Sequence, residues 1–405
     1  MNLPIKFFLL AVCSVFSASV LAKPQQSYNI FSGANDYFSY KVDGKIRLRH
    51  EEFDGIYTQN GGDRSDTYLR RADLALSGAI GQRLDYEWAG KINSEHKWTV
   101  KTFFLGFAPT GQTYLKLGRH DADFGLEMSS SSTWSLGVER SSIWELSPNA
   151  GEAEDGYGFS ASHHSLLTRL SLGHFEREDL TQNTLRAVLK PVHKKRHLLH
   201  LGYSYADAYD VNTEGRIRTN LGVYAVERHP DGNRTQLAKK VDSGVFNSDK
   251  TAVLEFAYLY GPVSLQAERL TRKLGDNNSN NAKPITRQAD GNYIQLAYSL
   301  TGEARNYDED QAVFGRLKSR NKKWGAWEIF ARTENLKVVG EAGMLSKKRA
   351  KSSAKIHTLG VNWYPGDDWR LTLDTRRGEC LEVPNDDGIT DGAAISMQVL
   401  YRFGG

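Results

Sequence analysis

The sequence predicts an all-β fold, a transmembrane antiparallel β-barrel of about sixteen strands. Three observations predict it: a C-terminal strand with one apolar face, the same alternation along the rest of the chain, and connections of two distinct lengths between the strand-like segments. A strand repeats every two residues, so alternation gives it one apolar face and one polar face. Such a strand suits a wall between lipid and water.

Large apolar side chains alternate with polar ones in the last strand, predicted at residues 393–403. The apolar row consists of Ile395, Met397, Val399, Tyr401 and Phe403. The polar row consists of Ser396, Gln398 and Arg402, and Leu400 interrupts it. An apolar row that ends in aromatic residues at the C-terminus is typical of the closing strand of an outer-membrane barrel. We therefore expect the polar row to line the periplasmic exit of the lumen.

Four other segments show the same alternation clearly: 44–50, 197–206, 292–300 and 369–375. Each offers one face that is compatible with lipid. A soluble β-sandwich would also contain alternating strands. It would not explain an export signal, an aromatic-terminated last strand and two classes of loop length together, so we prefer the membrane barrel.

The connections between strands fall into two classes, tight turns and long polar loops. Tight turns are predicted at 80–82, 109–111, 163–165, 261–262 and 365–367. Long loops are predicted near 54–65, 121–154, 208–248, 273–290, 338–354 and 378–392. Short periplasmic turns and long surface loops are the arrangement of outer-membrane barrels. Residues 303–323 are an exception, because they fall on the short-turn side and yet are long.

The N-terminus predicts export. Residues 1–22 contain Lys6, an apolar core and the run Val-Leu-Ala before Lys23, which is the pattern of a cleaved signal peptide. We expect a short periplasmic segment at 23–39 and a single barrel domain at 40–403, in the outer membrane of a Gram-negative bacterium. Cleavage would leave Cys380 as the one cysteine, so no internal disulfide is expected.

Composition and short motifs exclude several other functions. A net charge of +4 without long basic runs argues against a nucleic-acid-binding protein. The run 163–165, His-His-Ser, pairs a base with a hydroxyl, but neighbouring strand residues point to opposite faces, so we expect no catalytic residue and no enzyme. The acidic stretch 385–392 lacks the ligand spacing of a calcium loop, and the histidines lack metal spacing. We expect no metal and no cofactor.

Several local runs resemble the phosphate- and polyphosphate-selective O and P porins of Gram-negative outer membranes. They lie at 68–72 (YLRRA), 117–119 (LGR), 124–127 (FGLE), 139–140 (ER), 215–218 (GRIR), 260–266 (YGPVSLQ), 300–303 (LTGE), 324–328 (WGAWE) and 361–365 (VNWYP). Their order spans nearly the whole mature chain. The resemblance implies a sixteen-stranded, usually trimeric barrel whose third surface loop folds into the lumen, where a ladder of arginines steers anions.

Seven arginines are candidates for contact with the permeant: Arg47, Arg49, Arg70, Arg71, Arg140, Arg216 and Arg218. Lys45 shares its side of the first strand with Arg47 and Arg49. An arginine remains charged at physiological pH, and its planar group can hold a phosphate and release it to the next arginine. Arg70 and Arg71 are adjacent, so both can face the lumen only if a bulge intervenes.

The predicted constriction loop departs from the family pattern because it is rich in acids. Against the single Arg140 it contains Asp121, Asp123, Glu127, Glu139, Glu145, Glu152, Glu154 and Asp155. Carboxylates at a constriction raise the barrier for phosphate. We therefore expect a porin for small hydrophilic solutes, anions such as phosphate or polyphosphate among them, with a general or weakly selective pore as the alternative. A lipid-hydrolysing barrel and a plugged structural or adhesive barrel are further alternatives.

The expected partners are outer-membrane lipid, lipopolysaccharide, the permeant solutes and two further copies of the chain. The basic run Lys347–Arg349, with Lys351 and Lys355, either keeps a loop solvated or meets anionic lipid headgroups.

Overall fold

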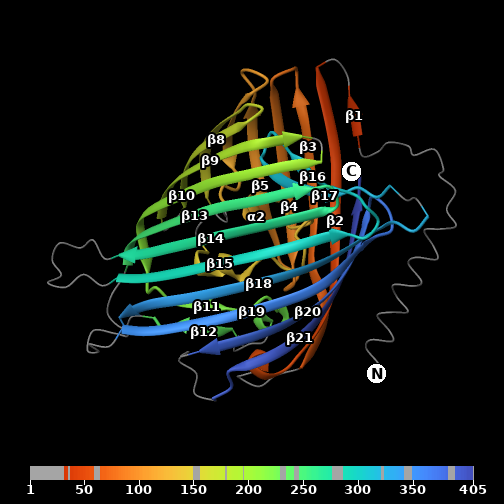
Figure 1. Ribbon diagram of the computed structural model, residues 1–405. Helices are drawn as coiled ribbons and strands as arrows, with labels where there is room; N and C mark the ends of the chain where they lie inside the picture. The colour runs from red at the N-terminus through yellow and green to blue at the C-terminus, as the bar shows by residue number, and fades with distance from the viewer. Residues whose placement is uncertain are drawn as a thin grey trace.

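The computed structural model describes residues 32–34, 37–58, 64–148, 156–177, 180–194, 196–228, 234–240, 246–275, 286–320, 323–341, 349–381 and 388–404. In these residues the chain forms a closed antiparallel barrel of sixteen strands, as predicted (Figure 1). The predicted signal peptide, 1–22, and most of the predicted periplasmic segment lie outside the described residues. No helix among the described residues has the length and apolar character needed to span a membrane.

The first eight strands of the barrel wall are β2 (Phe38–Phe53), β3 (Ser65–Ile80), β4 (Leu84–Asn93), β5 (Trp98–Phe107), β6 (Thr113–Arg119), β7 (Tyr157–His164), β8 (Thr168–Arg177) and β9 (Leu180–Lys194). The other eight are β10 (His197–Thr213), β13 (Phe246–Tyr260), β14 (Val263–Gly275), β15 (Thr286–Ser299), β18 (Ala326–Glu341), β19 (Arg349–Tyr364), β20 (Trp369–Leu381) and β21 (Asp391–Phe403). Each strand pairs with the next, and β21 pairs with β2 to close the ring. The short strand β1 (Ser32–Ala34) adds to β2 outside this order.

The predicted alternation is confirmed by burial. On β2, Ile46 and Leu48 are exposed on the outer face, whereas Arg49 is fully buried inside. On β21, Ile395 is 53% exposed and Ser396 is buried. Leu400, the apolar residue that interrupts the polar row of that strand, is also buried and faces inward. The barrel therefore presents apolar side chains to lipid and polar side chains to its lumen.

The five predicted tight turns join strands at one rim, which also holds the C-terminus. The long connection 300–325 at this rim is a real exception. It carries a hairpin of β16 (Arg305–Asp308) and β17 (Val313–Leu317), which we call the periplasmic hairpin. Its tip reaches into the barrel, where Arg186 of β9 donates to the carbonyls of Gln311 and Ala312. Residues 312–314 are buried there, whereas residues 309–311 are exposed. The periplasmic hairpin therefore partly fills the barrel at its short-turn rim, where a pore needs an exit.

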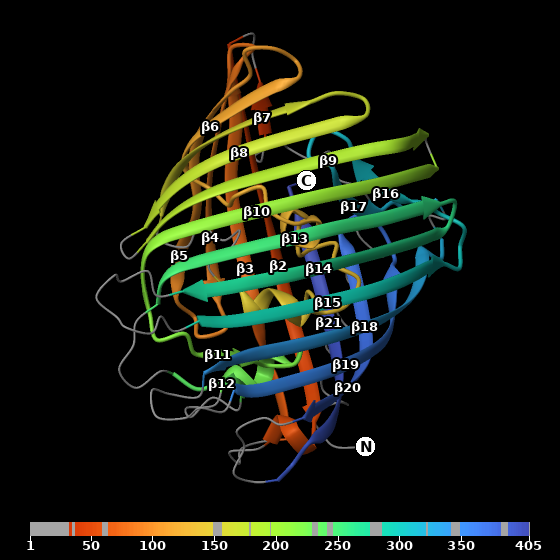
Figure 2. The ribbon, with the colours of Figure 1, turned by 60° about the vertical axis from the view of Figure 1, so that its left-hand side comes forward.

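Two long loops of the opposite rim also enter the barrel. Residues 120–156, the constriction loop, carry the short helices α2 (Leu126–Ser129) and η2 (Ser142–Leu146), and α2 lies within the ring of strands in both views (Figures 1 and 2). Residues 214–245, the mouth loop, carry β11 (Ile217–Thr219), η3 (Tyr224–Glu227) and β12 (Thr235–Ala238). A further short helix, η1 (Gly55–Thr58), follows β2.

Candidate functional site in the barrel lumen

The constriction loop packs its apolar residues against one side of the barrel. Leu126, Ile143 and Leu146 are fully buried, and η2 contacts β14, β15 and β18. Gly291 of β15 permits this approach, because a Cβ atom there would lie 2.9 Å from the Ile143 side chain and 2.8 Å from that of Leu146. The loop therefore covers the wall from β14 to β20 and also contacts Arg47 and Arg49 of β2. The inward side chains of β3–β6 are mostly half-buried, and we call these strands the open wall.

Carboxylates of the covered wall hold the backbone of the loop. Glu268 of β14 accepts hydrogen bonds from the amide of Leu126 at 2.7 Å and from the next amide at 3.0 Å. Glu334 of β18 accepts from the amide of Ser142 at 2.6 Å. Asp374 of β20 accepts from the amide of Val138 at 2.9 Å. These amides would otherwise be buried donors without partners, so the carboxylates fix the path of the loop.

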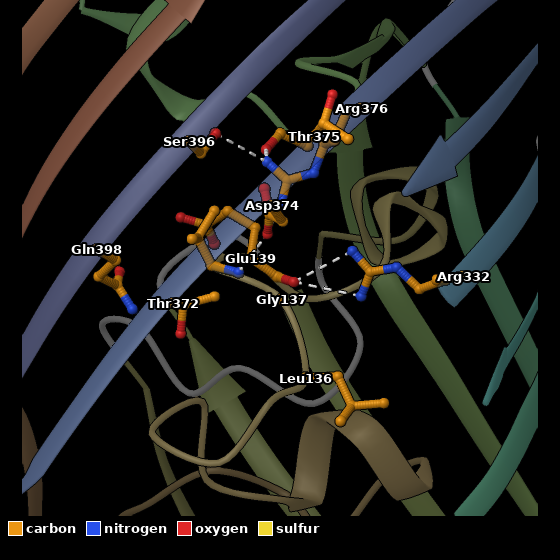
Figure 3. A network of polar contacts seen from close by, with 12 residues as sticks. Leu136, Gly137, Glu139, Arg332, Thr372, Asp374, Thr375, Arg376, Ser396 and Gln398 are labelled. Carbon is orange, nitrogen blue, oxygen red and sulfur yellow. Dashed lines mark hydrogen bonds and ion pairs between the residues drawn. The ribbon is translucent and has the colours of Figure 1, made fainter. Parts of the chain in front are cut away.

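Arginines of the wall hold the loop from the other direction. Arg332 donates to the carbonyl of Glu139 at 3.3 and 3.2 Å, as Figure 3 shows, and Arg370 donates to two further carbonyls of the loop at 2.7 Å. The Glu139 carboxylate itself accepts from Arg49 at 2.6 Å and from Arg70 at 2.7 Å. Burial opposes ionisation, but these two guanidinium groups outweigh it and hold the pKa of Glu139 well below its usual range.

The other acids of the constriction loop lie in different environments. Asp123 pairs with Arg186 at 2.7 Å and Arg169 at 2.8 Å, and despite burial these arginines hold its pKa well below the usual range. Burial raises the pKa of Glu127, which accepts from the indole of Trp144.

Glu145 interacts with the mouth loop, where it accepts from the Thr219 hydroxyl and from the Asn220 amide at 3.1 Å. Burial raises its pKa to about 8. Glu152, Glu154 and Asp155 lie outside the described residues. Counting acids in the sequence thus overstates the negative charge of the loop, because Asp123 and Glu139 are each neutralised by two arginines.

A bulge turns both Arg70 and Arg71 toward the lumen. Arg47 lies opposite Arg71 but Leu48 lies opposite Leu69, so Arg70 is the extra residue of β3. Its guanidinium contacts Glu139 and stacks on Tyr224 of the mouth loop, 3.6 Å from the ring centre. Arg71 instead donates to Asp73 at 2.6 Å. The condition under which both could face inward is therefore met.

The predicted arginines divide into two groups. Arg49 is fully buried, and Arg47, at 4% exposure, donates to Ser132 and Thr133 of the constriction loop. Both act as anchors of the loop. Arg71 and Arg140 are both partly exposed. Arg140 donates to carbonyls within its own loop at 3.2 and 2.8 Å.

The remaining two predicted arginines lie in the mouth loop. Arg216 is exposed and donates to Gln236 at 3.1 Å. Arg218 is half-buried, and burial together with the charges of Arg216 and Arg234 lowers its pKa. Positive charge is therefore gathered at the entrance of the barrel.

Lysines complete a cationic strip along the open wall. The strip consists of Lys45 of β2, Arg71 of β3, Lys91 of β4, Lys101 of β5 and Arg140. Asp73 lies within it, opposite both Lys45 and Lys91 in the strand register, and its carboxylate is 3.8 Å from the Lys45 ammonium. The charge of Lys101 interacts with those of Arg71, Asp121 and Arg140.

Lys91 and Lys101 were missed in the sequence. Lys91 could have been found, because residues 88–92 alternate as Trp-Ala-Gly-Lys-Ile and place it on the inner side. Lys101 could not, because β5 is irregular between the pairs Ala89–Thr102 and Gly90–Val100, which leaves Lys101 as an extra residue.

The run 163–165 forms no catalytic arrangement. His163 contacts Thr113 at 3.0 Å, whereas His164 contacts Asp310 of the periplasmic hairpin at 3.1 Å. Ser165 instead bonds Thr168 within the turn. Across the described residues, no group of three histidine, cysteine or acidic side chains is arranged to hold a metal ion.

Comparison with known sequences identifies the family. The sequence profile described as "Phosphate-selective porin O and P" matches residues 40–403. The chain belongs to this family. A relative, Porin O of Pseudomonas aeruginosa, is 33% identical over 395 residues, which cover 90% of this chain and 89% of that protein. The resemblance predicted from the sequence is confirmed, and the protein is an outer-membrane porin, a channel and not an enzyme.

Solved structures share the fold at low sequence identity. A loop-deleted OmpT of Vibrio cholerae superposes with a TM-score of 0.56 at 12% identity, covering 91% of this chain and 100% of that one. An anion-selective porin from Comamonas acidovorans superposes with a TM-score of 0.54 at 10% identity, covering 90% of this chain and 100% of that one. These likenesses support the porin barrel itself.

Proposed function

We propose that this porin conducts small anions, phosphate and polyphosphate among them, along the cationic strip of its open wall. The observation that carries the proposal is the separation of charge in the lumen. Asp123 and Glu139 of the constriction loop are paired with arginines, whereas the strip carries five cations, with Asp73 and Asp121 as the acids that interact with them. A permeant anion therefore passes a wall with excess positive charge.

The strip is suited to conduction because its cations are distributed and individually compensated. Lys45 and Arg71 share Asp73, and Lys101 interacts with Asp121, so no single cation is a deep trap for phosphate. Conduction requires several moderate sites in series. Arginine can hold two phosphate oxygens at once, whereas lysine acts as a compact charge that an ion leaves more easily.

The family profile and one structural neighbour support the anion proposal through their own descriptions. The family profile is described as phosphate-selective, and the structural neighbour from Comamonas acidovorans is anion-selective. The family profile matches nearly all of the barrel of this chain, so phosphate is the more relevant permeant.

A general, weakly selective pore is the second candidate, and a specific observation favours it. Asp85 and Glu87 of β4 add acidic groups to the open wall, between Asp73 and the short-turn rim. Asp85 accepts from the Tyr114 hydroxyl at 2.5 Å, and Glu87 accepts from the Thr102 hydroxyl at 2.8 Å. If these acids offset the strip, phosphate should pass without a preferred site.

Phosphate titration of chloride current distinguishes the two candidates. Single channels of the wild type in a planar bilayer should lose chloride current in a saturable manner as phosphate is added. A Lys101→Gln variant should require several-fold more phosphate, because one cation of the strip is lost. The matched variant Lys194→Gln, which removes an exposed lysine at the short-turn rim, should behave like the wild type. A linear, unsaturated response would favour the weakly selective pore, and absence of channel steps would indicate a plugged barrel.

We also propose that the mature protein is a homotrimer formed after removal of residues 1–22. The outward rows of β3, β4 and β5 contain apolar side chains and no charged residue, Leu74, Leu76, Trp88, Phe103 and Leu105 among them. A neighbouring copy could cover such a face, and the V. cholerae OmpT neighbour is described in a trimer form. Sedimentation of the detergent-solubilised protein and N-terminal sequencing test the two parts separately. Outer-membrane lipid and lipopolysaccharide would then contact the remaining outer wall.

A further inference from the structure

The periplasmic hairpin crosses the short-turn rim from one side of the barrel to the other. Its base is anchored by Arg305, whose guanidinium donates to both carboxylate oxygens of Glu328 on β18, at 2.7 and 2.8 Å. Further along the hairpin, the Tyr307 hydroxyl lies 2.6 Å from His200 of β10. Residues 309 and 310 then contact β9 and β7. The hairpin therefore spans the exit of the barrel, from a buried anchor on β18 to the wall at β7–β9.

Two histidines of the far wall hold the side chains of the tip. His164, the last residue of β7, lies 3.1 Å from the carboxylate of Asp310. His193 of β9 lies 2.8 Å from the carboxylate of Glu309. The Asp310 and Glu309 side chains are 76% and 55% exposed, whereas those of His164 and His193 are 22% and 13% exposed. Two adjacent acids of one turn thus meet two histidines of the wall at a place that water reaches.

The backbone of the tip is held separately, through its carbonyl oxygens. Lys190 of β9 donates to the carbonyl of Glu309 at 3.1 Å, and Arg169 of β8 donates to that of Asp310. Arg186 donates to the two carbonyls that follow, at 3.1 and 3.0 Å. An arginine stays charged over the whole physiological pH range. The two histidine pairs differ from these contacts, because a histidine gains or loses its charge between about pH 5 and 8.

Other charged and titratable groups lie on the elements around the two histidines. They are Lys116 of β6, Arg169 of β8, Arg186, Lys190 and Lys194 of β9, Arg196 in the turn that follows, His200 of β10, Asp123 of the constriction loop, Glu255 of β13, and Tyr307 and Asp308 of the hairpin. Arg186 pairs with Asp123 at 2.7 Å and with Glu255 at 2.8 Å. Asp308 accepts from the Gln311 amide at 2.9 Å. These three acids are thus engaged elsewhere, and Glu309 and Asp310 are the acids that contact His193 and His164.

We propose that the hairpin tip is a pH-sensitive gate of the channel, which His164 and His193 hold closed at acidic pH. A charged imidazole forms an ion pair with its carboxylate, and a neutral imidazole does not. Docking of the tip and binding of protons to the histidines therefore strengthen each other, so the tip should detach more often as the pH rises from about 5.5 to 8. The detached tip would pivot about the Arg305 anchor and widen the exit. The gate concerns the opening of the channel, so it does not depend on which ions the cationic strip prefers.

Hydrogen exchange of amides 306–314 at about pH 5.5 and 8 tests the proposal. An isolated hairpin is barely stable in water, so detachment of the tip exposes these amides to exchange. Their protection relative to an unfolded chain should fall about tenfold over this range, since each exposed ion pair contributes up to about fivefold. His164→Gln/His193→Gln should abolish most of this fall. Glu309→Gln/Asp310→Asn removes the same two pairs from the other side and should have the same effect.

A matched control replaces two histidines of the outer wall. His174 and His357 are exposed there, and each is hydrogen-bonded to a side chain of the neighbouring strand. His174→Gln/His357→Gln should therefore keep the full pH dependence of the tip.

Bilayer records measure the gating itself. They use a Glu145→Gln background, which removes the pH-dependent contact of the mouth loop. The fraction of time spent in the state of higher conductance should rise about tenfold between about pH 5.5 and 8. This rise should disappear when His164→Gln/His193→Gln is added. Channel steps at the lower pH confirm that each variant is folded.

Two results would overturn the inference. Protection of the tip could remain equally pH-dependent in the histidine variant and in the acid variant, which would assign the pH dependence to another group. Protection could also respond as expected while the conductance states do not, which would show that the tip moves without gating the channel. A wild-type channel without anion preference would contradict the proposed selectivity and leave this inference intact.

Discussion

Replacing Glu139 with glutamine should release the middle of the constriction loop from the barrel wall. One carboxylate oxygen of Glu139 accepts from Arg49 at 2.6 Å and from Arg70 at 2.7 Å. The amide keeps the shape but removes the charge, so the fully buried Arg49 loses the nearest of its anions. Breaking a buried ion pair from one side costs about 3–5 kcal/mol.

The lower end of that range applies here. The side chains of Glu139 and Arg70 are 21% and 19% exposed, so water screens part of the loss, and we expect about 3 kcal/mol. A change of this size raises the population of the detached loop by about a hundredfold. The loop also gains one unit of positive charge, which should increase the preference for anions.

Amide hydrogen exchange of peptides covering 132–141 measures the release directly. Their exchange should accelerate by about two orders of magnitude in Glu139→Gln, and brief closures should appear in single-channel records. The control Glu176→Gln changes a carboxylate that is 77% exposed on β8 and should leave both unchanged. Unaltered protection of the loop in Glu139→Gln would refute the idea that this ion pair holds it.

Three further predictions concern the other parts of the lumen. Arg186→Gln should free the tip of the periplasmic hairpin and raise single-channel conductance, because two carbonyls of the tip lose their buried donor; unchanged conductance would show that other contacts hold it. Burial in the attached constriction loop raises the pKa of Glu145 from about 4.5 to about 8, so between these pH values Glu145 holds its proton in the attached state and loses it in the detached state. The contact with the mouth loop therefore weakens as the pH rises from 4.5 to 8. In the wild type, the protection of amides 217–226 from hydrogen exchange, relative to an unfolded chain, should fall as the pH rises between these values. Glu145→Gln should make this protection much less dependent on pH, and an unchanged pH dependence would show that another group is responsible. Gly125→Ala should destabilise the constriction loop by about 1–3 kcal/mol, because φ is +69° there and a Cβ would overlap the ring of Trp144; normal loop exchange in this variant would contradict that.

The barrel was predictable from the sequence because its determinants are local. Alternation decides which residues face lipid, and Ile46, Leu48 and Ile395 all lie outward as the pattern requires. Turn residues such as Gly261 and Pro365 placed five tight connections correctly. The connection between Lys194 and His197 was missed, because residues 194–197 contain no glycine, proline, asparagine, aspartate or serine.

The lumen was less predictable because its charges are defined by contacts between distant segments. The constriction loop is acidic in the sequence, yet Glu139 and Asp123 are paired with arginines of strands far away along the chain. A bulge changes the facing of every residue beyond it, which explains why Arg70 joins Arg71 inside and why Lys101 was missed. Such irregularities leave no periodic signal in one sequence.

The reversal potential of the wild-type channel under a gradient of potassium chloride tests the central claim most directly. If the cationic strip of Lys45, Arg71 and Lys101 governs permeation, the potential should lie near the equilibrium value for chloride, and neutralising Lys45 and Lys101 together should move it toward zero. A wild-type potential at zero, or near the equilibrium value for potassium, would contradict the account.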